Sequence, residues 1–202
     1  MPRARKSSAR SARAASPPGD TKSKLIAAAL DLAASKGWRD LGMGEIAQAA
    51  GVSLGDAFAA FRTKAALLAG LSHQTSETVL SGGDAEGSPR EKLFELMMRR
   101  FDALKEHRAA LKAILRGSVG DPAAMCGVPA TLNAMAWMLE GAGFSAQGWR
   151  GRARCVALTG TYAATFRTFL DDDSDDLAKT MAALDRRLKS GPFGAGEGQS
   201  AT

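Results

Sequence analysis

Residues that favour β-sheets are scarce in this sequence. Valine and isoleucine together number only eight, and Tyr162 is the single tyrosine among 202 residues. Because these residue types are enriched in strands, a large β-sheet is excluded. Alanine, leucine and methionine are used instead, and they lose little side-chain freedom in a helix. The composition therefore predicts an all-α protein.

Cysteine and long apolar runs are scarce as well, and each absence excludes a class of protein. The two cysteines, Cys126 and Cys155, lie 29 positions apart without C-x-x-C spacing, which favours buried thiols over a disulfide or metal site. No apolar stretch approaches the roughly 18 residues that span a bilayer. The basic N-terminus lacks the apolar segment of a secretory signal. We therefore expect a bacterial-type cytoplasmic protein with no metal, no cofactor and no membrane contact.

The positive charge of the chain is concentrated at its N-terminus. The segment from Met1 to Lys24 holds seven basic residues and one acidic residue, Asp20, so it accounts for the whole formal net charge of +6. Its composition of serine, alanine and proline cannot bury a core. We expect residues 1–19 to form a disordered basic arm that neutralises phosphates through residues such as Arg10 and Arg13. The alternative is a solubilising tail.

Capping residues and apolar spacing together predict nine helices. They are expected at about 20–36, 43–50, 53–61, from 63 onward, 88–104, 109–116, 121–140, 145–170 and 174–189. Ser53, Thr63 and Ser88 are the clearest N-caps, and Ser145 and Ser174 are expected to cap the last two helices. The short second and third helices, separated by a glycine turn, form a helix-turn-helix.

The segment from Leu25 to Leu68 contains the pattern Glu45-Ile46-Ala47-x-x-Ala50-Gly51-Val52-Ser53-x-Gly55-x-x-Phe58-x-x-Phe61-x-Thr63-Lys64-x-x-Leu67-Leu68. This pattern resembles the DNA-binding domain of the tetracycline-repressor (TetR) family. The resemblance implies a nine-helix homodimer in which three N-terminal helices bind DNA. Four segments are then expected: a basic arm at 1–19, a helix-turn-helix DNA-binding domain at 20–66, a helical ligand-binding and dimerisation domain at 67–189, and a disordered tail at 190–202.

The expected DNA contacts lie in and around the third helix, in addition to the arm. They are Gly42, Ser53, Leu54, Gly55, Phe58, Ala59, Ala60 and Lys64. Ser53 and Lys64, each at the start of a helix, would hold phosphates. Leu54 and Ala59 could touch thymine methyl groups, because the third helix offers no side chain for a bidentate base contact. The expected partner is a palindromic double-stranded operator.

Three of these positions depart from the family pattern. Phe58 replaces the usual aromatic hydroxyl, Ala60 the usual histidine and Gly42 the usual threonine. Three phosphate or base contacts of the family are therefore missing. The alternative to sequence-specific DNA binding is a retained fold that no longer reads bases.

The ligand of the C-terminal domain is expected to be a small apolar molecule. Methionine and aromatic side chains on the inward helix faces are the expected contacts: Met97, Phe101, Leu104, Met125, Trp137, Met138, Tyr162 and Phe166. Flexible thioethers suit a pocket that accepts varied apolar ligands, and the Tyr162 hydroxyl could supply a polar contact. The alternative is that these residues form an ordinary core.

A dimer interface is predicted on the last two helices. A stripe of small residues and a heptad-like seam are expected to form it: Ala153, Ala157, Thr161, Ala164, Leu177, Met181, Leu184 and Leu188. Small residues let helices approach closely, so two copies would form a four-helix interface. The alternative is packing within one chain.

Two further functions were considered. Trp137 to Glu140 and Phe169 to Arg186 resemble TetR-like proteins related to the lipid-binding accessory protein of ubiquinone biosynthesis, which makes a DNA-independent lipid or isoprenoid binder the main alternative. An enzyme is not expected: Gly51-Val52-Ser53-Leu54-Gly55 matches G-x-S-x-G, but a nucleophile elbow needs a strand before the serine and this segment follows a helix. The sequence therefore favours a DNA-binding, ligand-responsive repressor.

Overall fold

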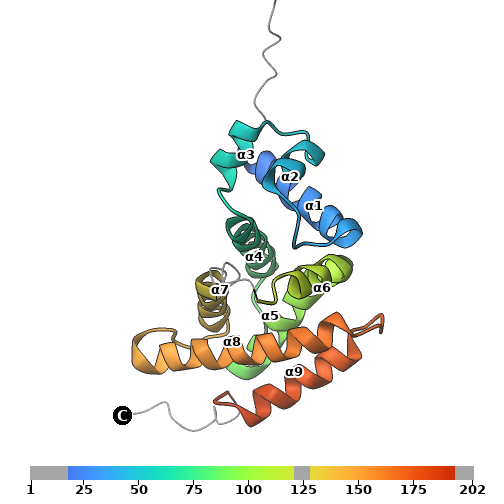
Figure 1. The fold of residues 1–202 in the computed structure, drawn as a ribbon. Coiled ribbons are helices and arrows are strands. Elements are labelled where there is room, and N and C mark those ends of the chain that lie inside the picture. Colours follow the sequence, from blue (N-terminus) through green and yellow to red (C-terminus); the bar gives the residue numbers. More distant parts are fainter. Residues whose placement is uncertain (1–17, 121–127, 194–202) are drawn as a thin grey trace, which may run out of the picture.

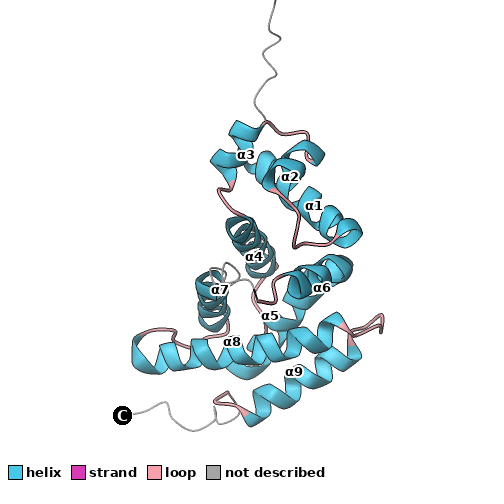
Figure 2. Cartoon of the chain, in the orientation of Figure 1, coloured by secondary structure: helices cyan, strands magenta, loops and turns pink. Residues whose placement is uncertain are grey.

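The computed structural model describes residues 18–120 and 128–193, and all regular structure in these two ranges is helical (Figures 1 and 2). They contain nine α-helices and one short 3-10 helix. The elements are α1 (Pro18–Lys36), α2 (Met43–Ala49), α3 (Leu54–Ala60), α4 (Lys64–Ser81), α5 (Pro89–Leu104), η1 (Lys105–His107), α6 (Arg108–Gly117), α7 (Val128–Gly141), α8 (Gly148–Leu170) and α9 (Ala178–Ser190). The expected all-α fold is confirmed. None of these helices combines the length and hydropathy needed to cross a bilayer.

The helices form a small head and a larger body (Figure 1). In the head, α1, α2 and α3 pack around Ile46, Ala47 and Ala57, which are buried. α4 leads from the head into the body, where it packs against α5 and α7. α8 and α9 lie side by side at the end of the molecule opposite α3. α1 also packs along α6, so the head and body are joined through two helices of the body.

Three predicted N-caps are confirmed. Ser53 Oγ accepts the Asp56 N–H at 3.1 Å, and Thr63 Oγ1 accepts the Ala66 N–H at 3.0 Å. Ser88 caps α5 in the same way. Each bond satisfies a backbone donor that has no partner inside its helix. These short-range bonds explain why the sequence located the starts of α3, α4 and α5 to within one residue.

The start of α8 differs from the prediction. α8 begins at Gly148 with Gln147 as its N-cap, and not at Ser145. Ser145 Oγ instead accepts the Gln147 N–H at 3.2 Å in a turn before the helix. This turn packs tightly on the first turn of α8, since a Cβ at Gly151 would stand 2.1 Å from the carbonyl carbon of Ala146. The expected start of the preceding helix, at residue 121, lies outside the described residues.

α9 begins at Ala178 and not at Ser174, because the preceding turn is organised by the buried carboxylate of Asp172. This carboxylate accepts the N–H of Ser174 at 3.2 Å and the N–H and hydroxyl of Thr180 at 2.8 and 2.7 Å. Ser174 Oγ donates to Asp172 and accepts the Ala178 N–H. Burial alone would raise the pKa of Asp172, but the hydrogen bonds from Ser174 and Thr180 hold it well below its ordinary value.

Candidate functional site

The outer face of α3 is apolar. Leu54 is 67% exposed and Phe58 is 62% exposed, and Gly55 and Ala59 are exposed beside them. The spacing of these positions places them on one side of the helix. The only polar side chain within α3 is that of Asp56. This face can therefore contact base pairs only through apolar atoms, such as the methyl group of thymine.

The polar groups at the ends of α3 are already engaged. Ser53 Oγ donates to the Asp56 carboxylate at 2.6 Å, which turns that negative charge back toward the cap. Lys64 Nζ donates to the carbonyl oxygens of Trp38 and Arg39 at 2.9 and 3.0 Å and lies 4.9 Å from the Trp38 ring centroid. An ammonium group has three donors. One donor of Lys64 therefore remains for a phosphate.

Arg62 is a cation at this surface that the sequence analysis did not select. Its guanidinium carbon lies 5.6 Å from the ring centroid of Phe58, an arrangement typical of a cation–π contact. The sequence could have indicated this residue, because Arg62 follows Phe58 by four positions and so continues the exposed face just after α3. Arg62 places a positive charge next to the apolar surface of α3.

The remaining predicted DNA contacts are spread around this surface. Gly42 is exposed as the N-cap of α2. Ala60 is half-buried and packs against the core, so it is less accessible than Ala59. Arg10 and Arg13 lie outside the described residues.

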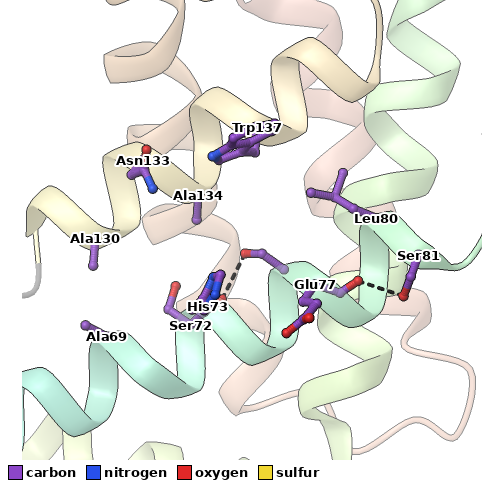
Figure 3. Close-up of a pocket in the computed structure, with 11 residues that line it drawn as sticks. Ala69, Ser72, His73, Glu77, Leu80, Ser81, Ala130, Asn133, Ala134 and Trp137 are labelled. Atoms are coloured by element: carbon purple, nitrogen blue, oxygen red, sulfur yellow. Dashed lines mark hydrogen bonds between the residues drawn. The ribbon is translucent and has the colours of Figure 1, made fainter. Parts of the chain in front are cut away.

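Two cavities adjoin α4 in the body. The first, of about 600 Å³, lies between α4 and α7, whose side chains face each other across it (Figure 3), and its polar residues include His73, Glu77 and Asn133. The second, of about 420 Å³, is bounded by residues of α4, α5, α6, α7 and α8 and is mainly apolar. Ser72 lines both. Both volumes fall in the range of small-molecule sites.

The predicted ligand contacts divide into three groups. Residues that line a cavity are Leu104, Trp137, Tyr162 and Phe166. Residues that are fully buried in the core and line neither cavity are Met97, Phe101 and Met138. Met125 lies outside the described residues. Helical spacing identified the inward faces, but it could not show which inward side chains are covered by neighbours and which border empty space.

Arg100 is the most unusual residue at the second cavity, and the sequence analysis missed it. It is only 2% exposed. One terminal nitrogen of its guanidinium donates to Ser76 Oγ at 2.7 Å and the other donates to Ser72 Oγ at 2.9 Å. A signal was present, because Arg100 follows Met97 by three positions and precedes Leu104 by four, which places it on the inward stripe of α5.

Part of the expected dimer seam is used inside one chain. Leu177, Leu184 and Leu188 are fully buried, and α9 packs against α8 and α5. These three side chains are therefore covered within a single protomer. They belong to the core and not, as predicted, to the dimer interface. Met181, which follows the same heptad-like spacing, is 42% exposed and lies at the edge of the buried stripe.

The outer face of α8 is displaced from the predicted stripe by about one residue. Ala153 is exposed, whereas Ala157, Thr161 and Ala164 are half-buried. Between Ala153 and Ala163 the exposed positions are Ala153, Val156, Gly160 and Ala163, and Val156 is 64% exposed. Trp149, Arg150, Arg152 and Arg167 are also exposed, toward the two ends of the helix. A surface with only small and apolar side chains at the four central positions is suited to close helix packing.

The N-terminal domain has a family match. Residues 25–71 match the family model described as "Bacterial regulatory proteins, tetR family". This segment contains most of α1, all of α2 and α3, and the start of α4. No curated protein that was compared matches the chain. The resemblance of the C-terminal half to the ubiquinone accessory protein therefore stays a prediction.

Solved structures share the fold of most of the chain. A TetR transcriptional regulator from Nitrosomonas europaea has a TM-score of 0.67 at 21% identity, covering 83% of this chain and 95% of its own. A TetR transcriptional regulator from Rhodococcus sp. RHA1 has a TM-score of 0.60 at 18% identity, with coverages of 85% and 97%. NalD of Pseudomonas aeruginosa, the secondary repressor of the MexAB-OprM multidrug efflux pump, has a TM-score of 0.51 at 19% identity, with coverages of 85% and 95%. Residues 25–71 are thus similar to the tetR family of bacterial regulatory proteins, and the chain shares the fold of solved TetR transcriptional regulators.

Proposed function

We propose that the protein is a homodimeric, DNA-binding transcriptional repressor that releases its operator when a small molecule with an apolar body binds. One observation carries this proposal: a tetR-family head with an exposed third helix is joined by α4 to a body that contains a cavity lined by α4 itself. NalD, which has a similar fold, is a repressor. The proposal assigns the head to DNA and the cavity to the ligand.

Two structural links could transmit ligand binding to the head. α4 begins at Lys64, directly after the helix-turn-helix, and its residues Leu68 and Ser72 line the second cavity. α6 also lines this cavity and packs along α1, and Arg39 donates to the Val119 carbonyl at 3.2 Å. Major-groove half-sites lie about 34 Å apart. A ligand that favours another separation of the two heads weakens DNA binding by its differential affinity for the two states.

The proposed dimer uses the exposed sides of α8 and α9. Val156 and Met181 are large apolar side chains exposed on these two helices, and the small residues Gly160 and Ala163 continue the α8 face. α8 and α9 lie opposite α3 (Figure 1). Pairing through them leaves both α3 helices free for DNA, as a two-fold arrangement requires.

The first experiment selects genomic fragments with purified protein at about 150 mM salt and excess non-specific competitor, because salt at this level weakens non-specific attraction to phosphates. The proposal expects an enriched palindrome. Enrichment of no sequence, together with retention that disappears at higher salt, contradicts sequence-specific binding. That result favours the DNA-independent lipid binder, which mass spectrometry of co-purified lipids would identify.

A second experiment tests the apolar contact of α3 directly. Replacing single thymines of the enriched site by uracil removes only the methyl group. At a contacted position, the loss of the methyl group should cost the wild-type protein about 0.8 kcal/mol of DNA-binding free energy, or roughly fourfold in affinity. Leu54→Ala or Phe58→Ala should abolish the discrimination at one position, whereas Val119→Ala, at an exposed apolar residue after α6, should leave it unchanged. Equal affinity for every uracil substitution would contradict apolar readout by α3.

A further inference from the structure

Arg100 is a buried cation with no countercharge among the described residues. No acidic side chain in the described part of the chain forms an ion pair with it, and its only hydrogen bonds go to the hydroxyls of Ser72 and Ser76. Its Nε is buried and has no hydrogen-bond partner among the described residues. Buried charges are normally paired, because removing an ion from water is costly. The two hydroxyls orient the guanidinium without neutralising it.

The hydrogen bonds of Arg100 leave part of its donor capacity unused. A guanidinium has five N–H donors in a planar fork, and two of them are used by the serines. The ring of Tyr162, whose centroid lies 5.4 Å from the guanidinium carbon, offers a weak cation–π attraction in place of a negative charge. Three donors remain, and carboxylates match such a fork with two parallel hydrogen bonds.

Arg100 lies in the wall of the second cavity, where the charged side chains are all positive among the described residues. Among the described residues that line it, the charged ones are Arg100 and Arg167, and none is an aspartate or a glutamate. Tyr162 lines the same cavity, and its hydroxyl makes no hydrogen bond to any described residue. Most of the remaining wall is apolar and includes Leu111 and Phe166. The cavity therefore combines an apolar body with a concentration of positive charge and free donors.

We propose that the second cavity binds an amphipathic carboxylate, with its carboxylate held by Arg100 and Tyr162 and its hydrocarbon or aromatic body against the apolar wall. This inference deepens the proposed function, on which it rests, by assigning the chemical class of the ligand. The serines serve as positioning residues, because they fix the plane of the guanidinium.

The test compares ligands that differ only in their head group. Binding of decanoate and 1-decanol, and of 4-phenylbutyrate and 4-phenylbutanol, is measured by isothermal titration with the full chain in the absence of DNA. A charge-assisted hydrogen bond in a buried site supports a preference of about tenfold or more for at least one acid over its alcohol. This comparison uses the wild-type protein, so it needs no variant that folds. Equal affinity for each acid and its alcohol, or no binding of either acid, overturns the proposal.

Variants then assign the preference to Arg100. Arg100→Gln should remove the preference for the acid and leave binding of the alcohol within about twofold, and Tyr162→Phe should weaken only the acid. Arg99→Gln is the matched control, because Arg99 is the neighbour on α5, donates to the carbonyls of Gly82 and Gly83, and does not line the cavity. It should retain the wild-type preference. A preference that persists in folded Arg100→Gln overturns the assignment.

The failure of this inference can be told apart from the failure of the proposed function. Head-group preference is measured without DNA, and operator selection is measured without ligand. Acid-selective binding with no operator supports the cavity assignment and contradicts the repressor. An operator together with equal acid and alcohol binding supports the repressor and overturns the carboxylate site.

Discussion

Gly70 of α4 lies directly against the ring of Phe61, the residue that ends α3. A Cβ atom at position 70 would stand 2.6 Å from Cε1 of this ring, which is closer than van der Waals contact allows. The absence of a side chain at Gly70 therefore lets the end of α3 pack onto α4. This contact sets the position of the candidate DNA-reading helix relative to the helix that lines both cavities.

Gly70→Ala is expected to destabilise the protein, because the added methyl group forces Phe61 or α4 to move at a cost of about 1–3 kcal/mol. The gain in helix propensity, about 1 kcal/mol, offsets only part of this cost. Urea unfolding measures the change. Gly19→Ala is the control, because a Cβ there meets no atom within 4 Å, and it should not lower stability. A stability of Gly70→Ala at or above that of the wild type would contradict the packing argument.

Lys64→Ala should weaken binding to all DNA sequences about equally and lower the slope of log K against log salt by about 0.9. The reason is that two donors of the ammonium group bind the carbonyl oxygens of Trp38 and Arg39, and the third is proposed to bind a phosphate. Fluorescence anisotropy at several salt concentrations measures the slope. Lys189→Ala, which removes the same charge from α9 at the opposite end of the molecule, is the control. An unchanged slope would show that Lys64 only ties Trp38 and Arg39 to α4.

Asp172→Asn is expected to lower the free energy of unfolding by about 2 kcal/mol or more, because a buried carboxylate that accepts several hydrogen bonds is replaced by an amide. Asp173→Asn is the matched control at the next position. Asp173 is exposed and pairs only with Lys179, so this change should stay within about 0.5 kcal/mol. Similar losses in both variants would argue against a special role for the buried carboxylate.

The carboxylate of Asp172 should also make the free energy of unfolding depend on pH in the acidic range. Its folded-state pKa lies below the value of about 3.9 expected in the unfolded chain. The unfolded state then binds the proton more readily, so the stabilisation is complete above about pH 5 and is lost as the pH falls below 4. Urea unfolding between pH 6 and pH 3 should show the difference between wild type and Asp172→Asn shrinking toward low pH. A difference that stays constant would contradict this assignment.

Val156→Glu should convert the proposed dimer into a monomer, because two charges would be buried where the α8 helices meet. Light scattering at micromolar concentration measures the mass. Val119→Glu, at a similarly exposed valine after α6, should leave the dimer intact. A wild-type monomer at these concentrations would remove the dimer proposal.

Deletion of residues 1–17 should reduce the salt dependence of DNA binding, since the deleted segment holds five of the basic residues and α1 begins at Pro18. The loss of slope should be up to about 0.9 for each phosphate contact removed. Replacing only Arg10 and Arg13 by glutamine should give a smaller loss. A truncated protein with unchanged slope but lower solubility would instead identify the arm as a solubilising tail.

The helical class, the helix-turn-helix and the starts of α3, α4 and α5 could all be predicted from the amino-acid sequence. These features depend on composition and on hydrogen bonds between residues three positions apart, such as Thr63 with the amide of Ala66, so they can be read from a short window. The residues proposed to contact DNA were chosen from the resemblance to the TetR family, and of these Leu54, Gly55, Phe58 and Ala59 are exposed.

Which inward or apolar residues belong to the core, and which remain available for other contacts, depends on how the helices pack against one another. The periodicity of Leu177, Leu184 and Leu188 is the same whether they meet another protomer or α8 of their own chain, and the fold buries them within one chain. Arg100 lies at a helical position like those of its apolar neighbours. Its buried guanidinium is held by Ser72 and Ser76, which α4 brings to it from more than twenty residues away. Burial is a property of contacts between distant segments, and no local pattern specifies it.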